Sequence, residues 1–402
     1  MRIANLLASL ACLAVSSSAL AQAPEPIDLA IGDAARKDRQ VTLAVDQIHD
    51  TSRGVDLSSD EVAATLADAG IVLVGESHTS SESHRVQSLV ITALQRAGRK
   101  VILGLEMFPA TAPTAPFDRW VRGGIDQDAL LRESGWYDYW GYPFGYYREI
   151  FEIAKRHRLP IRGVNAPRAL ISSVGRRGLA GIGAMERAQL PDTIDTTKDE
   201  HRQLFVAYVG ESATHGSGMP PDALQRMLDA QSTWDATMAF HAAGLLAEAK
   251  DPRAVVVVLV GSGHVAYGLG IARQARPYTT ARVATVMPVA LTPGTSAHVR
   301  ASFGDIVWGV PAETYPLYPT LGVSFRSSGD QPNTVLMVAP GSPADAMGIK
   351  AGDVLGSLDD TAIRKDVDVR ALLDRKVWGD AVRATVTRGS ETLTLRGHLR
   401  RR

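Results

Sequence analysis

The sequence predicts a three-layer α/β domain with a mainly parallel central sheet, followed by a small β-rich domain. First, the 402 residues exceed what one hydrophobic core usually organises, so two domains are expected. Second, continuous apolar runs alternate with long helical patterns, as in parallel sheets that helices cover on both faces. Third, prolines that suit neither a helix nor a central strand interrupt the chain at Pro311, Pro316 and Pro319.

The strands of the α/β domain are predicted from short apolar runs that have no polar face. These runs are Ile71–Val74, Val101–Leu105, Ile161–Val164 and Val255–Val260. The helical patterns between them include Ser83–Gly98, Tyr147–Arg158 and Asp222–Lys250. Since strands that alternate with helices favour crossovers within one parallel sheet, the runs are expected to be neighbours in that sheet.

The composition gives no sign of a partner bound through net charge. Lys plus Arg (43) balance Asp plus Glu (43), so the formal net charge is zero and nucleic-acid binding is not expected. Hydrophobic residues make up 45% and charged residues 21%, which excludes a collagen, a coiled coil or a wholly disordered chain.

The N-terminus has the pattern of a cleavable secretory signal. Arg2 precedes the apolar run Ile3–Val15, and Ala19 and Ala21 suit the signal-peptidase pockets. The run is shorter than the roughly 20 apolar residues of a spanning helix, so no transmembrane segment is expected. Cys12, the single cysteine, lies inside this signal, so the mature chain has neither a disulfide nor a thiol ligand. The sequence therefore predicts a secreted protein, with the periplasm as the expected compartment.

These patterns divide the chain into five parts. They are a signal at 1–21, a loosely packing leader at 22–55, the α/β domain at 56–310, a linker at 311–318 and the β-rich domain at 319–400.

Polar side chains follow three of the predicted strands. Two strands run into the pattern Gly-x-x-His, which ends at His78 and at His264, and a third delivers Glu106. Glu76 lies inside the first of these patterns. Because ligands bind beyond the carboxyl ends of parallel strands, the four side chains are expected to converge as candidate catalytic residues.

Three chemical interpretations of this edge stay open. His78, Glu106 and His264 are a plausible ligand set for a divalent metal ion with open positions. Without metal, the same groups provide a general base and its orienting partner. Alternatively, each histidine only satisfies its own turn.

The motifs together resemble the ChaN-like haem-binding uptake proteins, over roughly residues 60 to 290. The motifs are Gly75-Glu76-Ser77-His78, His84-Arg85-x-Gln87, Leu105-Glu106-Met107, Asn165-Ala166-Pro167-Arg168, Gln231-x-x-Trp234-Asp235-x-x-Met238-Ala239 and Gly261-Ser262-Gly263-His264-Val265. The resemblance implies haem binding in iron uptake. It extends to a superfamily that includes Tiki-type metal-dependent proteases and erythromycin esterases, where Glu76, His78, Glu106 and His264 match catalytic-type positions.

An aromatic run offers candidate haem ligands. The segment Trp136–Tyr147 holds five of the ten tyrosines, namely Tyr137, Tyr139, Tyr142, Tyr146 and Tyr147. With no mature cysteine, an axial ligand to haem iron would be His, Tyr or Met. The resemblance implies tyrosine ligation and leaves open which tyrosine binds. The alternative is a lid or packing loop, since aromatic side chains are core builders first.

The C-terminal part resembles a PDZ domain over about 320 to 399. The motifs are Leu321-Gly322-Val323-Ser324-Phe325, Val335–Val338, Pro340-Gly341-Ser342-Pro343-Ala344 and Gly348-Ile349-Lys350-Ala351-Gly352-Asp353-Val354-Leu355. The resemblance implies that the loop with Leu321, Gly322 and Val323 presents backbone N–H groups to a peptide's terminal carboxylate. The following strand offers an edge for β-addition, next to a helix at Asp366–Lys376. The alternative is a domain used only for packing.

The sequence thus predicts a secreted haem-binding protein in haem or iron handling, with a peptide-binding PDZ domain. The rival function is a metal-dependent or histidine-based hydrolase, to which the PDZ domain presents protein C-termini. A third alternative is an interaction scaffold with a vestigial site. A homodimer stays open as well.

The exported protein is expected to begin at Gln22. Ala19 and Ala21 fit the cleavage pockets, whereas Ser9 stands where a lipid-attachment signal at Cys12 would need an aliphatic residue. N-terminal sequencing of the exported protein measures this directly, and a diacylated Cys12 would contradict it.

Overall fold

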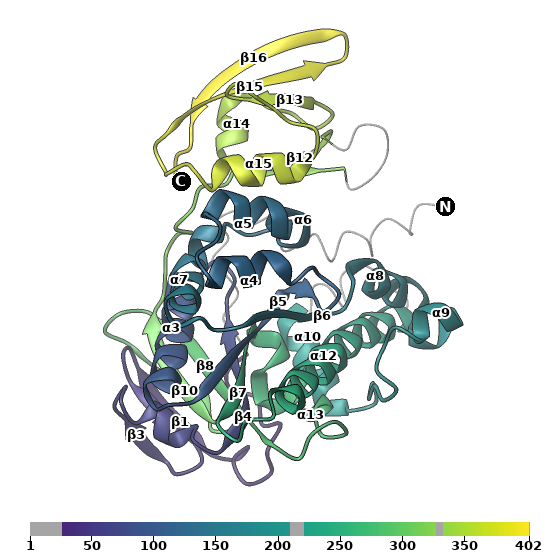
Figure 1. Cartoon of the computed structure of the whole chain (residues 1–402). Coiled ribbons are helices and arrows are strands. Elements are labelled where there is room, and N and C mark those ends of the chain that lie inside the picture. The colour runs from purple at the N-terminus through teal and green to yellow at the C-terminus, as the bar shows by residue number, and fades with distance from the viewer. Residues whose placement is uncertain (1–25, 210–220, 327–332, 402) are drawn as a thin grey trace. The chain divides into compact units, whose positions relative to one another are not determined.

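The computed structural model describes residues 26–209, 221–326 and 333–401 (Figure 1). The predicted signal at 1–21, with Cys12, lies outside these residues. The chain divides into two compact units. The α/β unit comprises the described residues of Pro24–Ser134 and Glu149–Glu313, and the C-terminal unit comprises Gly135–Arg148 and the described residues of Thr314–Arg402. The boundary after Glu313 falls inside the predicted linker.

The α/β unit is built on an eight-stranded sheet with the strand order β3-β2-β10-β8-β4-β7-β5-β6. The strands are β2 (Ile48–Asp50), β3 (Val55–Leu57), β4 (Ala69–Glu76), β5 (Lys100–Pro109), β6 (Ile161–Asn165), β7 (Ala254–Gly261), β8 (Arg282–Leu291) and β10 (Ile306–Pro311). Neighbouring strands from β10 to β6 pair in parallel. Strand β2 pairs antiparallel with both of its neighbours, β10 and β3. The prediction of a mainly parallel sheet is confirmed.

Helices cover the central strands, which is why every residue of β4 and β7 is buried. Helix α3 (Ser81–Arg96) packs on β4, β5 and β8, while the long helix α12 (Pro221–Ala249) packs on β4, β5, β6 and β7 (Figure 1). The remaining helices of the unit are α2 (Val62–Thr65), α4 (Ala115–Val121), α5 (Gln127–Ser134), α7 (Arg148–His157), α8 (Arg168–Arg177), η3 (Leu179–Gly181), α9 (Ala184–Arg187), α10 (Asp199–Val209), η4 (Ser262–His264), η5 (Ala266–Gly268) and α13 (Ile271–Gln274). Neither these helices nor the others in the described part of the chain are long and apolar enough to cross a membrane.

The segment expected to be a loosely packing leader is instead part of the α/β unit, from residue 26 onward. Strand β1 (Gln40–Ala44) pairs with β9 (Ser296–Arg300), and β2 pairs with β10 at the edge of the main sheet. Leu43 is fully buried, and Ile31 is nearly so. These short strands escaped prediction because their partners lie near the far end of the unit, which local periodicity does not reveal.

The C-terminal unit contains the expected small antiparallel sheets. Its elements are β11 (Val323–Phe325), β12 (Val335–Val338), α14 (Pro343–Met347), β13 (Val354–Leu358), β14 (Thr361–Ala362), α15 (Asp366–Leu373), β15 (Ala381–Arg388) and β16 (Glu391–His398). Strands β14, β13, β15 and β16 form one sheet, and β11 pairs with β12 in another. Leu355, Leu358 and Val386 are among the fully buried residues of its core.

The aromatic segment Gly135–Arg148 belongs to the C-terminal unit, although its neighbours in sequence belong to the other unit. It forms α6 (Trp136–Tyr139), which contacts α15, and η2 (Phe144–Tyr146). The Tyr146 hydroxyl accepts a hydrogen bond from the Leu317 N–H at 3.0 Å, and its ring meets that of Tyr318 edge-on, with centroids 4.8 Å apart. Gly145 N–H also donates to Asp374. Much of the segment therefore serves packing within this unit.

Tyr146→Phe is expected to weaken this packing. The substitution removes the acceptor of the Leu317 N–H, and loss of one hydrogen bond costs about 1 kcal/mol. Hydrogen exchange at the Leu317 amide should therefore become faster, as mass spectrometry or NMR would measure. Tyr139→Phe removes the same hydroxyl from a side chain that is 41% exposed, and it should leave that exchange unchanged. Equal exchange rates in the wild type and Tyr146→Phe would contradict the contact.

Candidate functional site

The predicted site residues lie where β4, β5 and β7 end, and these strands are neighbours in the sheet. Glu76 is the last residue of β4 and is paired in register with Gly261, the last residue of β7. Glu106 lies near the end of β5, and His264 closes the short helix η4 that follows β7. The register of parallel strands thus delivers the carboxylates and the histidines to one edge. We call Glu76, His78, Glu106 and His264 the strand-end site.

Glu76 is buried and held by several donors. Its Oε1 lies 2.8 Å from Nδ1 of His78, and its Oε2 accepts a hydrogen bond from the Gln87 amide at 2.6 Å. His84 Nδ1 lies 3.6 Å from the same Oε2. The side chain of His78 is 26% exposed, so a bound molecule can reach its ring. Glu76 therefore acts as an anchor that fixes the ring of His78.

Glu106, near the end of β5, contacts Gly261 at the end of β7 and His264 just after it. Its Oε2 accepts a hydrogen bond from the Gly261 N–H at 2.7 Å, and its Oε1 lies 3.5 Å from Nε2 of His264. A Cβ on Gly261 would lie 3.1 Å from Cε1 of His78 and 3.7 Å from Oε2 of Glu106. His78, Glu106 and His264 therefore do converge, around a glycine whose missing side chain leaves them room.

His264 has carboxylates near both ring nitrogens. Its Nδ1 lies 2.6 Å from Oδ1 of Asp235 and 2.9 Å from the amide of Gln231. Gln231 and Asp235 are four residues apart on α12, so they share one face of that helix. Asp235 is fully buried. Burial of a carboxylate is costly unless it is paired and hydrogen-bonded, and His264 provides such a partner. The imidazole of His264 is thus fixed from both sides.

The pKa values at this edge favour charged groups. Burial alone would lower the pKa of His264, but the charge of Asp235 and the hydrogen bonds with Asp235 and Glu106 raise it to about 10. Burial alone would also lower the pKa of His78, but the hydrogen bond with Glu76 and the charge of Glu106 raise it. The pKa values of Glu106 and Asp235 are lowered against burial, because the histidines favour their ionised forms.

The structure gives no support for the predicted divalent metal ion. Among the residues that the structure describes, no group of three or more His, Cys, Asp or Glu side chains is arranged to hold a metal ion. Nδ1 of His264 lies against Asp235 and the Gln231 amide, and its Nε2 lies 3.5 Å from Oε1 of Glu106. We therefore assign no chemistry at this edge to a divalent metal.

The five tyrosines of the aromatic segment differ in exposure. Tyr137, Tyr146 and Tyr147 are buried, whereas Tyr139 is 41% exposed and Tyr142 is half-buried. Burial, together with the nearby charge of Asp374, raises the pKa of Tyr137 far above its usual range. Tyr147 accepts a hydrogen bond from the Trp140 indole within the same segment. Only Tyr139 and Tyr142 therefore keep the access that a large planar ligand requires.

The predicted peptide-binding loop precedes β11. Gly322 has a φ of 79°, and a Cβ there would lie 2.2 Å from Cβ of Ser342, so the loop requires glycine. Leu321 is buried, and Val323 begins the strand. Within the described part of the chain, the N–H groups of Leu321 and Gly322 donate to no acceptor. These donors suit a carboxylate.

Sequence reasoning missed the residues behind the predicted ones. Asp235 and Gln87 were noticed only as parts of motifs, and His201 was not noticed at all. The signal for Asp235 was its spacing from Gln231 on one helix face. His201 gave no local signal, because it lies on α10, beyond the predicted helices, and only the fold brings it within 3.3 Å of Asp235.

Two family models match the chain. The model described as haem-binding uptake, Tiki superfamily, ChaN matches residues 62–274, which is more than half of the 402 residues. A PDZ domain model matches residues 319–399. A comparison with curated proteins gave no significant match.

Solved structures resemble one or the other part. A structure described as cofacial heme binding to ChaN of Campylobacter jejuni is 19% identical, with a TM-score of 0.50 over 65% of this chain and 95% of that one. At this identity the likeness supports the fold alone. The HtrA-type protease AlgW with a decapeptide is 18% identical over 28% of this chain and 48% of its own, with a TM-score of 0.20. That score is too low to support an argument.

The free energy of unfolding is expected to decrease as the pH rises from about 6.5 to about 10. His264 has a pKa of about 10 in the folded chain, against about 6.5 when unfolded. The folded chain therefore binds the extra proton in this window, and its stabilisation is complete below the unfolded pKa and lost as the pH rises through the folded one. Chemical denaturation at a series of pH values measures this slope.

A matched pair of variants assigns the slope to His264. His264→Gln should flatten it, because the titrating ring is gone, whereas His298→Gln changes an exposed histidine on β9 and should preserve it. An equal slope in the wild type and His264→Gln would contradict the raised pKa.

Proposed function

Because the chain belongs to the haem-binding uptake family of the Tiki superfamily, the ChaN family, we propose that it binds haem in haem or iron handling outside the cytoplasm. The family match over residues 62–274 is the observation that carries this proposal. The secretory pattern of residues 1–21 supports the location. The PDZ domain at 319–399 supports a second partner, a peptide with a free C-terminus.

Tyr139 and Tyr142 are the proposed donors to haem iron. Of the five tyrosines in the aromatic segment, these two combine access with neighbouring apolar rings, since the ring centroids of Trp140 and Tyr142 are 5.3 Å apart. A phenolate is a hard anionic donor that favours Fe(III), so reduction should loosen the complex. That behaviour suits a protein that passes haem to another carrier.

The double variant Tyr139→Phe/Tyr142→Phe should lose the tyrosinate signature of ferric haem. Phenylalanine keeps the apolar surface but removes both phenol oxygens, so the charge-transfer band should disappear while weak hydrophobic association partly persists. Absorbance titration of the purified full chain with ferric haem measures both effects.

The control for this experiment is the strand-end site. His78→Ala changes a different donor and should leave the spectrum unchanged. A spectrum that survives the tyrosine substitutions but is lost in His78→Ala would contradict tyrosine ligation and move the haem to the strand-end site.

The PDZ domain is proposed to bind peptides through their terminal carboxylate. The backbone donors of Leu321 and Gly322 supply the contact, and one added strand buries little surface, so we expect micromolar affinity, about 8 kcal/mol. Titration of the full chain with matched free-acid and amidated peptides measures the preference. Equal binding of both forms would contradict this assignment of the loop.

A second candidate function is a histidine-based hydrolase at the strand-end site. The observation that favours it is the pair of His78 and Glu76, in which a buried carboxylate orients an accessible imidazole. In this candidate, the PDZ domain presents protein C-termini as substrates. Peptide hydrolysis by the purified chain, lost in His78→Ala and retained in Tyr139→Phe/Tyr142→Phe, would favour this function over haem handling.

A further inference from the structure

The fully buried carboxylate of Asp235 lies between two histidines. Oδ1 lies 2.6 Å from Nδ1 of His264, and Oδ2 lies 3.3 Å from Nε2 of His201. His201 and Asp235 are 2% and 0% exposed in their side chains, so solvent water does not compete for these contacts. The two histidines come from α10 and from η4, and Asp235 on α12 is the group that joins them.

Arg273 determines which nitrogen of His201 carries the proton. One guanidinium nitrogen of Arg273 lies 3.2 Å from Nδ1 of His201. A guanidinium has five N–H donors and no acceptor, so His201 must present a lone pair at Nδ1. In the tautomer that fits this contact, the ring proton is on Nε2, the nitrogen that faces Asp235. This tautomer gives the carboxylate a donor instead of a second lone pair.

Arg273 is itself held firmly. Its Nε donates to the carbonyl oxygen of Leu269 at 2.7 Å, and it donates to the carbonyl oxygen of Asp195 at 3.1 Å and forms an ion pair with the Asp195 carboxylate. The guanidinium therefore cannot rotate away from His201 without losing other contacts. Its position fixes the donor that faces Nδ1 of His201.

We propose that Asp235, His201 and Arg273 are positioning residues that orient His264 at the strand-end site. The donors run in one direction: Arg273 donates to His201, and Nε2 of His201 faces Oδ2 of Asp235 at 3.3 Å. The other oxygen, Oδ1, accepts from Nδ1 of His264. This contact directs Nε2 of the His264 ring toward Glu106, at 3.5 Å. The proposal concerns the strand-end site itself and does not depend on haem binding.

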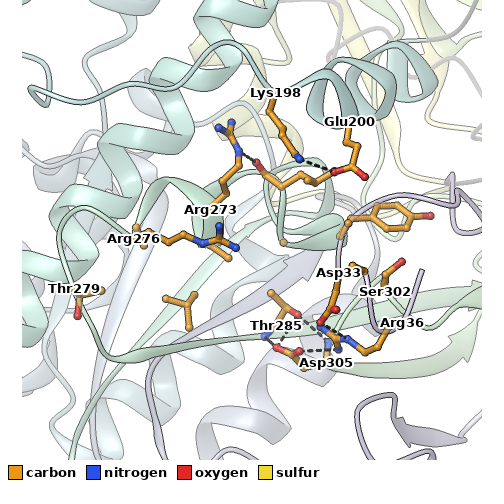
Figure 2. A pocket seen from close by; sticks show the side chains of 18 of the residues that line it. Asp33, Arg36, Lys198, Glu200, Arg273, Arg276, Thr279, Thr285, Ser302 and Asp305 are labelled. Carbon is orange, nitrogen blue, oxygen red and sulfur yellow. Dashed lines mark hydrogen bonds and ion pairs between the residues drawn. The ribbon is translucent and has the colours of Figure 1, made fainter. Parts of the chain in front are cut away.

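Arg273, the first donor in this series of contacts, lies in the wall of a separate cavity. Arg273 and Arg276 both line a cavity of about 590 Å³, together with Lys198 and Glu200 (Figure 2). Arg276 contributes the same charge to this wall, but its side chain makes no hydrogen bond or ion pair within the described part of the chain. It therefore provides a matched control, because substituting it changes the cavity without touching His201.

The test reads the ring nitrogens directly. In the full chain labelled with ¹⁵N-histidine, two-dimensional NMR distinguishes a protonated ring nitrogen from one with a lone pair. We expect His201 as the Nε2–H tautomer and His264 with a proton on Nδ1. A wild-type His201 protonated on Nδ1 would overturn the proposal, and this result requires no variant to fold.

Two variants extend the test. Arg273→Met removes the donors, so the His201 spectrum should shift toward the Nδ1–H tautomer, whereas Arg276→Met should leave it unchanged. Asp235→Asn leaves one acceptor oxygen for two ring N–H groups, so the spectrum of His201 or of His264 must change. Unchanged rings in Asp235→Asn, or equal shifts in both arginine variants, would overturn the positioning role. Haem titration is a separate readout, so failure of the proposed function would not imitate either result.

Discussion

The strand-end site depends on three carboxylates that the fold removes from water. The exposed fractions of Glu76, Glu106 and Asp235 are 2%, 8% and 0%, and a buried carboxylate without donors costs far more than one contact returns. The donors come from histidines, from the Gln87 amide and from the Gly261 N–H, each placed by a different element. Replacing such pairs by apolar groups is often neutral or stabilising. We therefore interpret the site as kept for function rather than for stability.

The aromatic segment changes how the two parts of the chain are understood. Its residues are inserted between α5 and α7 of the α/β unit, yet they pack with the C-terminal unit through Tyr146, Gly145 and α6. The chain thus passes between the units at residues 134/135, 148/149 and 313/314 rather than once. The proposed haem donors, Tyr139 and Tyr142, belong to the same unit as the PDZ domain. Haem and peptide would then be bound by one unit, while the strand-end site belongs to the other.

The sequence predicted the parts of the fold that carry local signals. The apolar runs of β4 and β7 predicted a parallel sheet. The two Gly-x-x-His patterns after them predicted that His78 and His264 lie at one edge of that sheet. Short edge strands such as β1 were missed because their partners are remote. His201 was missed for the same physical reason, since its role comes from a contact with α12. The burial of Tyr146 and Tyr147 could not be predicted, because an aromatic run does not show which of its rings will pack into a core.

The central claim is that the buried charges of the strand-end site serve function and not stability. The most direct measurement is the free energy of unfolding, near neutral pH, of a variant in which Asp235 is replaced by Leu and both of its imidazole partners, His201 and His264, by Phe. These apolar replacements remove the carboxylate and both imidazoles together, so no member of this buried group is left without its partner. We predict a stability within about 1 kcal/mol of the wild type, because the lost ion pairs and the relieved desolvation offset each other. A loss of about 3 to 5 kcal/mol, as for a broken buried pair, would contradict the account.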